Sequence, residues 1–259
     1  MSSQSNLTCK NCGHPAEEKF CPNCGQSTDV RRFNGSYFLY KLIHSFDLDR
    51  GFFHTIFLLL KKPGLAISDF IGGKRVGFSN PFKVFLITGA VATFWTLHSG
   101  DFDYKGEEIW IANYLNQWYG FVEYSGKYFS FFTLTGMIVF SFFTWLFFIK
   151  SGYNFYENVI LNFYIASGQF IIVLLFVPLF WLEKASFLID DLTGWVYGSI
   201  NTGYNIWVVV VFFKAYKLRA LLIAILAVLI PYPISGFMNY WIYVIAPESF
   251  WEYLDSILM

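Results

Sequence analysis

The chain has 259 residues, of which 56% are hydrophobic, 22% are aromatic and only 14% are charged. A soluble domain carries roughly 25% charged residues, so this chain is too poor in charge to cover a globular surface in water. Lys and Arg balance Asp and Glu at 18 each, so no net charge attracts the chain to nucleic acid. The composition excludes a secreted disulfide scaffold, a disordered tail and a DNA-coating protein, and it indicates an integral membrane protein.

All four cysteines lie within residues 1–30, in two CxxC pairs that are each followed by glycine: Cys9 with Cys12, and Cys21 with Cys24. Two such turns close a tetrahedral Cys₄ site, the usual ligand set of structural Zn²⁺. Neither pair has a surrounding βαβ pattern, so a thioredoxin-like redox site lacks its context. Four thiolates leave no open position for a water or substrate. We therefore expect a ribbon that folds around structural zinc, with His14 as a bystander.

Basic and acidic residues alternate around this ribbon. Its cations Lys10, Lys19, Arg31 and Arg32 are offset by Glu17, Glu18 and Asp29. Phosphate contacts need a concentrated cationic face. We therefore expect a protein partner for the ribbon rather than nucleic acid.

Residues 31–81 predict helices at the cytoplasmic membrane surface. Segments 37–46 and 52–60 place apolar residues at helical spacing but are too short to cross a bilayer. Four cations border them, and we expect these to meet lipid headgroups: Lys61, Lys62, Lys74 and Arg75. An equally weighted interpretation has these helices pack beneath the membrane bundle as a cap, and both can hold at once.

Residues 82–259 predict a transmembrane domain of about five helices. The expected spans are 82–98, 128–149, 159–182, 192–213 and 218–245. The last contains Pro231 and Pro233, and its first run, 218–230, would rise only about 20 Å as helix. We favour one kinked span over a re-entrant pair. The expected fold is an all-α integral membrane bundle with a small N-terminal Cys₄ zinc ribbon.

The charges predict an orientation for this bundle. With the amino terminus in the cytoplasm, every Lys and Arg except Lys105, Lys127 and Lys184 lies on the cytoplasmic side. Cations near the ends of spans are retained on that side. We therefore expect a multi-pass protein of the cell (inner) membrane with its carboxyl terminus outside.

Several short motifs occur in a characteristic order. CxxCG and FCxNCGQ are followed by an LDRGFFxT-like segment at 48–55, Lys-Pro-Gly at 62–64, an IGGKR box at 71–75 and Asn-Pro-Phe at 80–82. In this order they resemble domain-of-unknown-function family 3667, bacterial multi-pass membrane proteins with an amino-terminal zinc ribbon. The motif-bearing part covers about residues 9–82. The resemblance implies membrane residence and the ribbon, and it implies no reaction.

Polar residues inside the predicted spans are the places to look for a pathway. They are Glu157, Asn158, Asn162 and Gln169 in the third span, Asn201 and Asn205 in the fourth, and Asn239 in the fifth. Such groups face the bundle interior, because they are costly in contact with lipid. They could line a path for a small solute or proton, but we favour hydrogen bonds between helices. Gly194 and Gly198 indicate a close helix contact of the GxxxG kind.

Enzyme motifs are missing, so we expect no enzyme: the sequence has no GxSxG, Walker loop, GxGxxG or HExxH. Two functions from different classes remain. The favoured one is a scaffold or adaptor whose ribbon recruits a cytoplasmic or membrane protein, with self-assembly of the chain left open. The alternative is a small-solute transporter or channel through the polar third to fifth spans.

Overall fold

The computed structural model describes residues 8–16, 18–30, 32–36, 51–99, 128–183 and 187–258. Within these ranges every regular element is a helix, apart from two isolated β-bridges in the ribbon. The helices are α2 (Gly51–Lys61), α3 (Pro63–Gly72), α4 (Pro81–Ser99), α6 (Phe129–Phe147), a 3₁₀ turn (Ile149–Ser151), α7 (Phe155–Glu183), α8 (Phe187–Phe212), α9 (Leu218–Leu229), α10 (Pro231–Ile245) and α11 (Glu248–Leu258). The all-α class is therefore confirmed. The predicted interfacial segment 37–46 and the loop after α4 lie outside the described residues.

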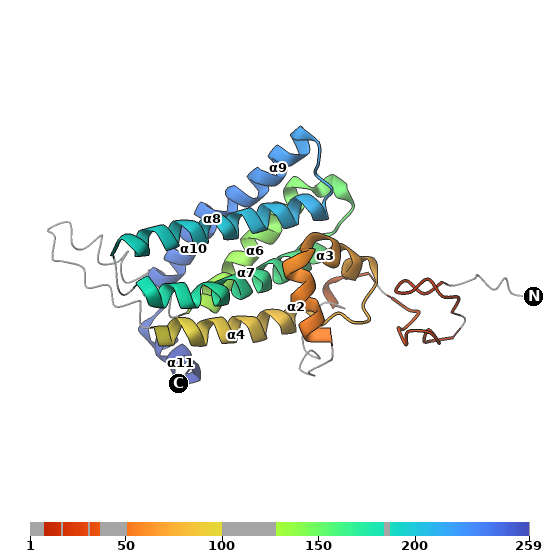
Figure 1. The fold of residues 1–259 in the computed structure, drawn as a ribbon, viewed down its shortest axis with the longest axis horizontal. Helices are drawn as coiled ribbons and strands as arrows, with labels where there is room; N and C mark the ends of the chain where they lie inside the picture. The colour runs from red at the N-terminus through yellow and green to blue at the C-terminus, as the bar shows by residue number, and fades with distance from the viewer. Residues whose placement is uncertain are drawn as a thin grey trace, which may run out of the picture.

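The long helices run side by side, and α7 occupies the centre of the bundle (Figure 1). Ile160, Leu161, Tyr164 and Phe170 of α7 are almost completely buried. A helix that is apolar all round is stable only when its whole surface meets protein or lipid. Here α4, α6 and α8 cover α7, and its neighbours leave their outer faces to the surroundings.

Three helices are long and apolar enough to cross a membrane, judged over the described residues. They are Ser130–Phe147 in α6, Phe155–Phe176 in α7 and Leu218–Ile245 through α9 and α10. Over its described side chains, α4 counts as a shorter apolar helix, Pro81–Trp95. Over the described residues the protein is thus helical with three membrane-length helices, and the count of five spans stays a prediction.

The last of these helices is broken but not reversed. Ile230 joins α9 to α10 with helical dihedrals of −65° and −41°, and its N–H still bonds to Leu226 O at 3.0 Å. Pro231 has no N–H to donate to the carbonyl four residues before it, which explains the break at this point. The two helices follow one direction through the molecule (Figure 1). This agrees with a single kinked segment rather than a re-entrant pair.

Helices α2 and α3 close one end of the bundle, and the motif residues hold them there. Ser79 N–H donates to Thr55 Oγ1 at 2.8 Å, which ties the segment after α3 to α2. Tyr164 Oη donates to Ser79 O at 2.7 Å, and Tyr204 Oη donates to Leu59 O at 3.1 Å. These bonds anchor the cap, residues 51–80, to α7 and α8.

Two glycines of this cap sit where no side chain fits. A Cβ on Gly51 would lie 2.9 Å from Gly77 O, and one on Gly64 would lie 2.7 Å from Val211 Cβ. The Gly of the Lys-Pro-Gly motif therefore lets α3 pack closely on the end of α8.

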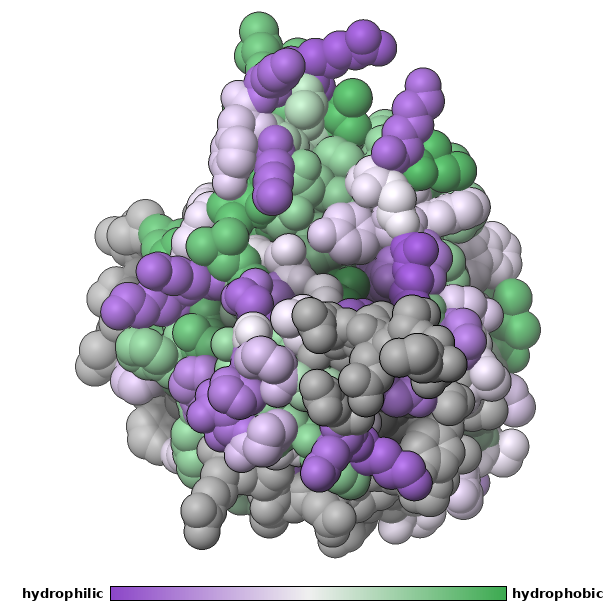
Figure 2. All heavy atoms as spheres, turned by 90° about the vertical axis from the view of Figure 1, so that its right-hand side faces the viewer, coloured by the Kyte–Doolittle hydropathy of each residue, from purple (hydrophilic) through white to green (hydrophobic). Residues whose placement is uncertain are grey.

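One end of the bundle carries the ribbon, α2 and α3, and at that end α4, α7 and α9 begin while α6 and α8 end (Figure 1). Many described cations lie in the segments that meet there, among them Lys61, Lys62, Lys150, Lys214 and Lys217. Figure 2 looks onto this end and shows hydrophilic side chains spread between apolar ones. The basic residues of distant segments therefore share one end of the molecule.

Helix α11 was not anticipated from the sequence, which assigned no element beyond the last span. Its Trp251 is buried and packs on Tyr128, with ring centroids 5.2 Å apart, and on Phe132 at 6.0 Å. Tyr128 Oη also donates to Trp251 O at 3.3 Å. The amphipathic pattern that begins at Glu248 was a readable signal for this helix.

Candidate metal centre and candidate binding cavity

The four cysteines converge into one cluster whose sulfur atoms all lie within 4.8 Å of one another. Cys9 Sγ is 3.6 Å from Cys24 Sγ, and Cys12 Sγ is 3.6 Å from Cys21 Sγ. Thiolates at a Zn–S distance of about 2.3 Å around a tetrahedral ion stand about 3.8 Å apart. The donor set and its spacing therefore fit a metal ion, as the sequence predicted.

The two CxxC turns have the same backbone geometry. Cys9 N–H donates to His14 O at 2.9 Å and Gly13 N–H to Cys9 O at 2.8 Å. Cys21, Gly25 and Gln26 repeat the pattern at 2.8 Å for both bonds. Both glycines take a left-handed conformation, with φ of 74° at Gly13 and 73° at Gly25, which glycine adopts without strain.

Backbone amides of the turns also act on the sulfur atoms. The N–H of His14 donates toward Cys12 and lowers the pKa of its thiol to about 6. Cys12 is therefore largely a thiolate at neutral pH, and the thiolate is the form that binds a metal. The imidazole of His14 is not part of the cluster, which agrees with its expected bystander role.

Gln26 fastens the ribbon to the cap through three hydrogen bonds. Its Nε2 donates to Gly73 O at 2.7 Å, and its Oε1 accepts from Arg75 N at 2.9 Å and from Val76 N at 3.2 Å. Gly73 has a φ of 112° and ends α3. The final Gln of FCxNCGQ and the IGGKR box thus form one structural unit, although 47 residues separate them.

Glu157 makes a second connection, from the chain after the ribbon to the start of α7. Arg32 pairs with it through Nε to Oε1 and Nη2 to Oε2, both at 2.8 Å. Asn154 N–H donates to Glu157 Oε2 at 2.8 Å, and Glu157 N–H donates to Asn154 Oδ1 at 2.9 Å. This reciprocal pair is a capping box. Glu157 therefore caps α7 and holds Arg32, and neither it nor Asn158 lines the cavity described below.

The four cations expected at lipid headgroups have different surroundings. Lys61 and Lys62 are exposed at the junction of α2 and α3, with Lys61 Nζ 5.2 Å from the centre of the Phe57 ring. Lys74 pairs with Asp69 at 2.9 Å. Arg75 lies over the Phe33 ring at 4.3 Å. Headgroup binding stays a prediction, and Lys61 and Lys62 are the best placed for it.

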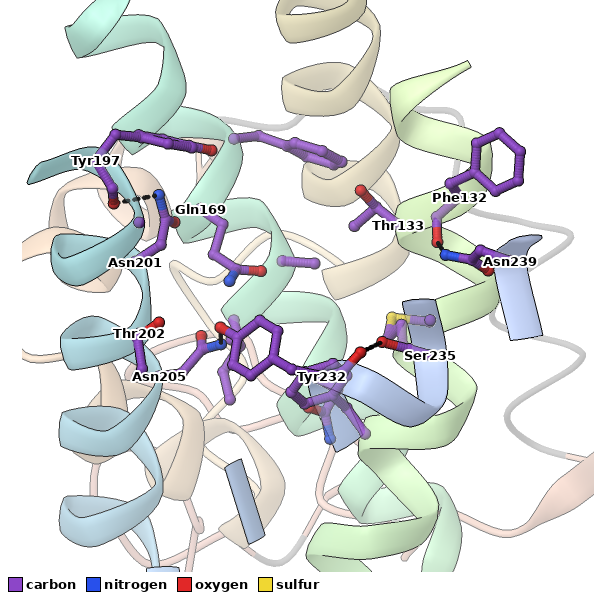
Figure 3. Close-up of a pocket in the computed structure, with 18 residues that line it drawn as sticks. Phe132, Thr133, Gln169, Tyr197, Asn201, Thr202, Asn205, Tyr232, Ser235 and Asn239 are labelled. Carbon is purple, nitrogen blue, oxygen red and sulfur yellow. Dashed lines mark hydrogen bonds between the residues drawn. The ribbon is translucent and has the colours of Figure 1, made fainter. Parts of the chain in front are cut away.

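A cavity of about 320 Å³ lies in the bundle between α6, α7, α8 and α10. Five of the predicted polar residues line it: Asn162 and Gln169 of α7, Asn201 and Asn205 of α8, and Asn239 of α10. Figure 3 shows Gln169, Asn201, Asn205 and Tyr232 pointing toward a common space. Tertiary packing thus brings together amides that the sequence distributes over three spans.

Hydrogen bonds hold most of these amides in place. Asn205 Nδ2 donates to Tyr232 Oη at 2.8 Å, Asn201 Nδ2 to Tyr197 O at 3.2 Å, and Asn239 Nδ2 to Phe132 O at 3.2 Å. Two of the three bonds cross between helices, as favoured from the sequence. The Oδ1 atoms of Asn201 and Asn205 are nevertheless buried without a protein partner among the described residues.

Other cavity residues were missed in the sequence, namely Thr133, Tyr197, Thr202, Tyr232 and Ser235. Single hydroxyl groups on apolar helices carry a weak signal, because each can bond to its own helix instead of facing a cavity. Gly198 also lines the cavity, and a Cβ there would meet no atom within 4 Å. The close helix contact expected at Gly198 is therefore not found in the described part of the chain.

Comparison with known proteins supports the family resemblance. No curated protein and no solved structure matches the chain significantly. The sequence model of one family, described as a protein of unknown function (DUF3667), matches residues 49–93, which form α2, α3 and most of α4. The family whose model matches the cap and most of α4 is thus the one that the motifs resemble.

Proposed function

We propose that this protein binds a small polar solute inside the membrane and passes it across. The cavity between α6, α7, α8 and α10 carries the proposal, because polar side chains from all four helices line it. A polar group in contact with hydrocarbon costs several kcal/mol. A bundle stabilised by packing alone has no need of such a space.

The position of the cavity supports passage. Measured along α7, Asn162 lies about 10 Å and Gln169 about 21 Å from Phe155. A bilayer core about 30 Å thick that begins at Phe155 therefore has its middle between these two residues. Tyr232 is the second residue after Ile230, where the helix breaks. Broken helices next to a polar site at mid-depth are typical of transporters.

The membrane topology that this function requires, and the metal of the ribbon, are part of the proposal. We infer five crossings, made by α4, α6, α7, α8 and the α9–α10 pair, with the ribbon in the bacterial cytoplasm. The support is the gathering of cations in the segments that meet at the ribbon end, among them Lys61, Lys62, Lys150, Lys214 and Lys217. A reducing compartment keeps thiols free, and Zn²⁺ is the ion that four thiolates in this spacing favour.

Flux through proteoliposomes tests the function. The protein is reconstituted, and entry of glycerol or urea is followed by light scattering as the vesicles reswell. Gly198→Phe places a ring at the cavity, where a Cβ meets no atom within 4 Å, and Gly203→Phe is its matched control on α8 outside the cavity. We expect faster entry than in protein-free vesicles and its loss in Gly198→Phe alone. Equal rates in all samples would reject solute passage.

A second function, the adaptor, is favoured by one observation. Phe20 of the ribbon is 62% exposed and lies on the β-bridge with Ser27, whereas Gln26 is occupied by the cap. An exposed aromatic residue beside a rigid metal site suits a protein contact. Affinity purification from native membranes with Phe20→Ser tests it, since a true partner is lost while the metal is retained.

A further inference from the structure

The two amide oxygens without a protein partner are the feature of the cavity that points to a ligand. Asn201 and Asn205 lie one turn apart on α8, and the two residues are only 7% and 3% exposed. Both Oδ1 atoms lack a hydrogen-bond partner among the described residues. Buried polar atoms in proteins are nearly always paired. The described residues therefore leave both groups open to a bound molecule.

The neighbours of each amide decide what kind of group is missing. Asn201 Nδ2 donates to Tyr197 O, and because a carbonyl oxygen only accepts, the orientation of this amide is determined. Its free atom is the acceptor Oδ1. Asn205 bonds to the hydroxyl of Tyr232, which can accept or donate, so Asn205 can offer either an oxygen or an N–H. The missing group must donate to Asn201 and can do either at Asn205.

The charge of the lining restricts the ligand further. None of the described residues around the cavity is Asp, Glu, Lys, Arg or His. An ion without a countercharge at this depth is strongly disfavoured. The rest of the wall is apolar and aromatic, including Phe140, Phe170 and Met137. The volume of about 320 Å³ is at the lower end of small-molecule sites and equals about ten water molecules.

We propose that this cavity is a binding site for an uncharged small molecule with hydroxyl or amide N–H groups, which donates a hydrogen bond to Asn201 Oδ1 and exchanges one with Asn205. The aromatic walls contact its apolar side. This inference rests on the proposed function and names the class of its solute.

Ligand-observed NMR on the wild-type chain in nanodiscs tests the site. Saturation transfer from the protein is measured for glycerol, erythritol, urea and acetamide, with empty nanodiscs as the blank. We expect at least one of these probes to receive saturation that reaches a plateau with concentration. Potassium or sodium chloride should not displace it any more than choline chloride does.

Matched substitutions locate the binding. Asn201→Leu and Asn205→Leu keep the size of the side chain and remove its polar atoms, and each should weaken probe binding by about 3-fold to 10-fold. Asn158→Leu is the control, because Asn158 Oδ1 is also buried without a partner but lies outside the cavity. The Asn158→Leu variant should bind the probe with the wild-type affinity. Each variant is used only if it elutes as wild type in size-exclusion chromatography.

Three results would overturn the inference: no neutral probe binds, which leaves only water in the cavity; alkali cations displace the probe; or binding survives in both cavity variants. Binding without flux in the vesicle assay would reject solute passage and leave the site intact. Flux that is insensitive to Asn201→Leu and Asn205→Leu would reject the site and leave passage intact.

Discussion

The ribbon end of the molecule and the cavity use the same kinds of polar side chain in opposite ways. At the ribbon end, Gln26 makes three hydrogen bonds to the chain between Gly73 and Val76, and Glu157 completes both a capping box and an ion pair. In the cavity, the Oδ1 atoms of Asn201 and Asn205 have no protein partner among the described residues. Paired groups hold the ribbon end rigid, whereas unpaired ones are available to another molecule.

This contrast gives different expectations for the two regions. Substitutions in the ribbon and cap should lower stability, because each removes or strains a contact that is made within the chain. Substitution of Asn201 in the cavity should change stability little, because its Oδ1 has no partner among the described residues and its Nδ2 bonds only within its own helix. The following experiments are ordered from the largest expected effect on stability to the smallest.

Loss of the metal should have the largest effect, and it should be confined to the ribbon. Cys21→Ser/Cys24→Ser removes two of four ligands, and metal binding supplies on the order of 10 kcal/mol to such small folds. We expect one zinc ion per wild-type chain, none in the variant, and rapid proteolysis within residues 8–30. His14→Ala, outside the cluster, should keep its zinc. Full zinc content in the double variant would contradict the assigned ligand set.

Removing the cation of the Arg32–Glu157 pair should come next. The Glu157 side chain is 4% exposed and that of Arg32 is 61% exposed, so Arg32→Met leaves a nearly buried carboxylate without its cation. We expect a loss of about 1–3 kcal/mol, below the value for a fully buried pair because water screens the guanidinium. Glu157→Gln in the same chain should restore part of it, since glutamine also completes a capping box. Thermal unfolding in detergent measures the stability of the single variants and of the double variant. If the losses of Arg32→Met and Glu157→Gln simply add in the double variant, the two residues are uncoupled.

Two glycines of α3 test the packing of the cap. Gly64→Ala brings a Cβ to 2.7 Å from Val211 Cβ and 2.9 Å from Phe212 N, whereas a Cβ on Gly72 meets no atom within 4 Å. We expect Gly64→Ala to cost about 1–3 kcal/mol through overpacking and Gly72→Ala to change stability by no more than about 0.5 kcal/mol. Equal unfolding midpoints for the two variants would show that α3 does not pack closely on α8.

Gln26→Ala should weaken the contact between the ribbon and the cap without loss of the metal ion. Three hydrogen bonds disappear, and the backbone groups of Arg75 and Val76 become accessible to water, so we expect a cost of about 1–2 kcal/mol at the contact between ribbon and cap. Hydrogen exchange at residues 73–76 should rise while the zinc content stays at one per chain. Unchanged exchange there would mean that Gln26 does not fasten the ribbon.

A pair of asparagines compares the two regions most directly. Asn154→Ala removes the N-cap of α7, which typically costs about 1 kcal/mol. Asn201→Leu removes an amide whose oxygen has no protein partner, so its change should stay within about 0.5 kcal/mol while probe binding falls. If Asn201→Leu is the more destabilising of the two, the cavity amide is structural and the contrast fails.

Local sequence signals predicted the local chemistry. The CxxC turns are determined over a few residues by cysteine spacing and by glycines that take positive φ at Gly13 and Gly25, so the metal cluster was predictable. Residues 128–149 and 218–245 were predicted as membrane-length helices because hydrophobicity is additive along a helix. Helix α11, which the sequence analysis did not anticipate, shows where this reasoning ended.

By itself, the sequence determined that the protein is helical, rich in apolar surface and equipped with four clustered cysteines, because these properties depend on composition and short spacings. Only the tertiary structure decided which polar residues share a site. Glu157 and Asn162 are five residues apart in α7, yet the first caps the helix beside Arg32 and the second faces the cavity. Their different neighbours come from segments distant in the chain, and no local pattern encodes which of those segments will pack there.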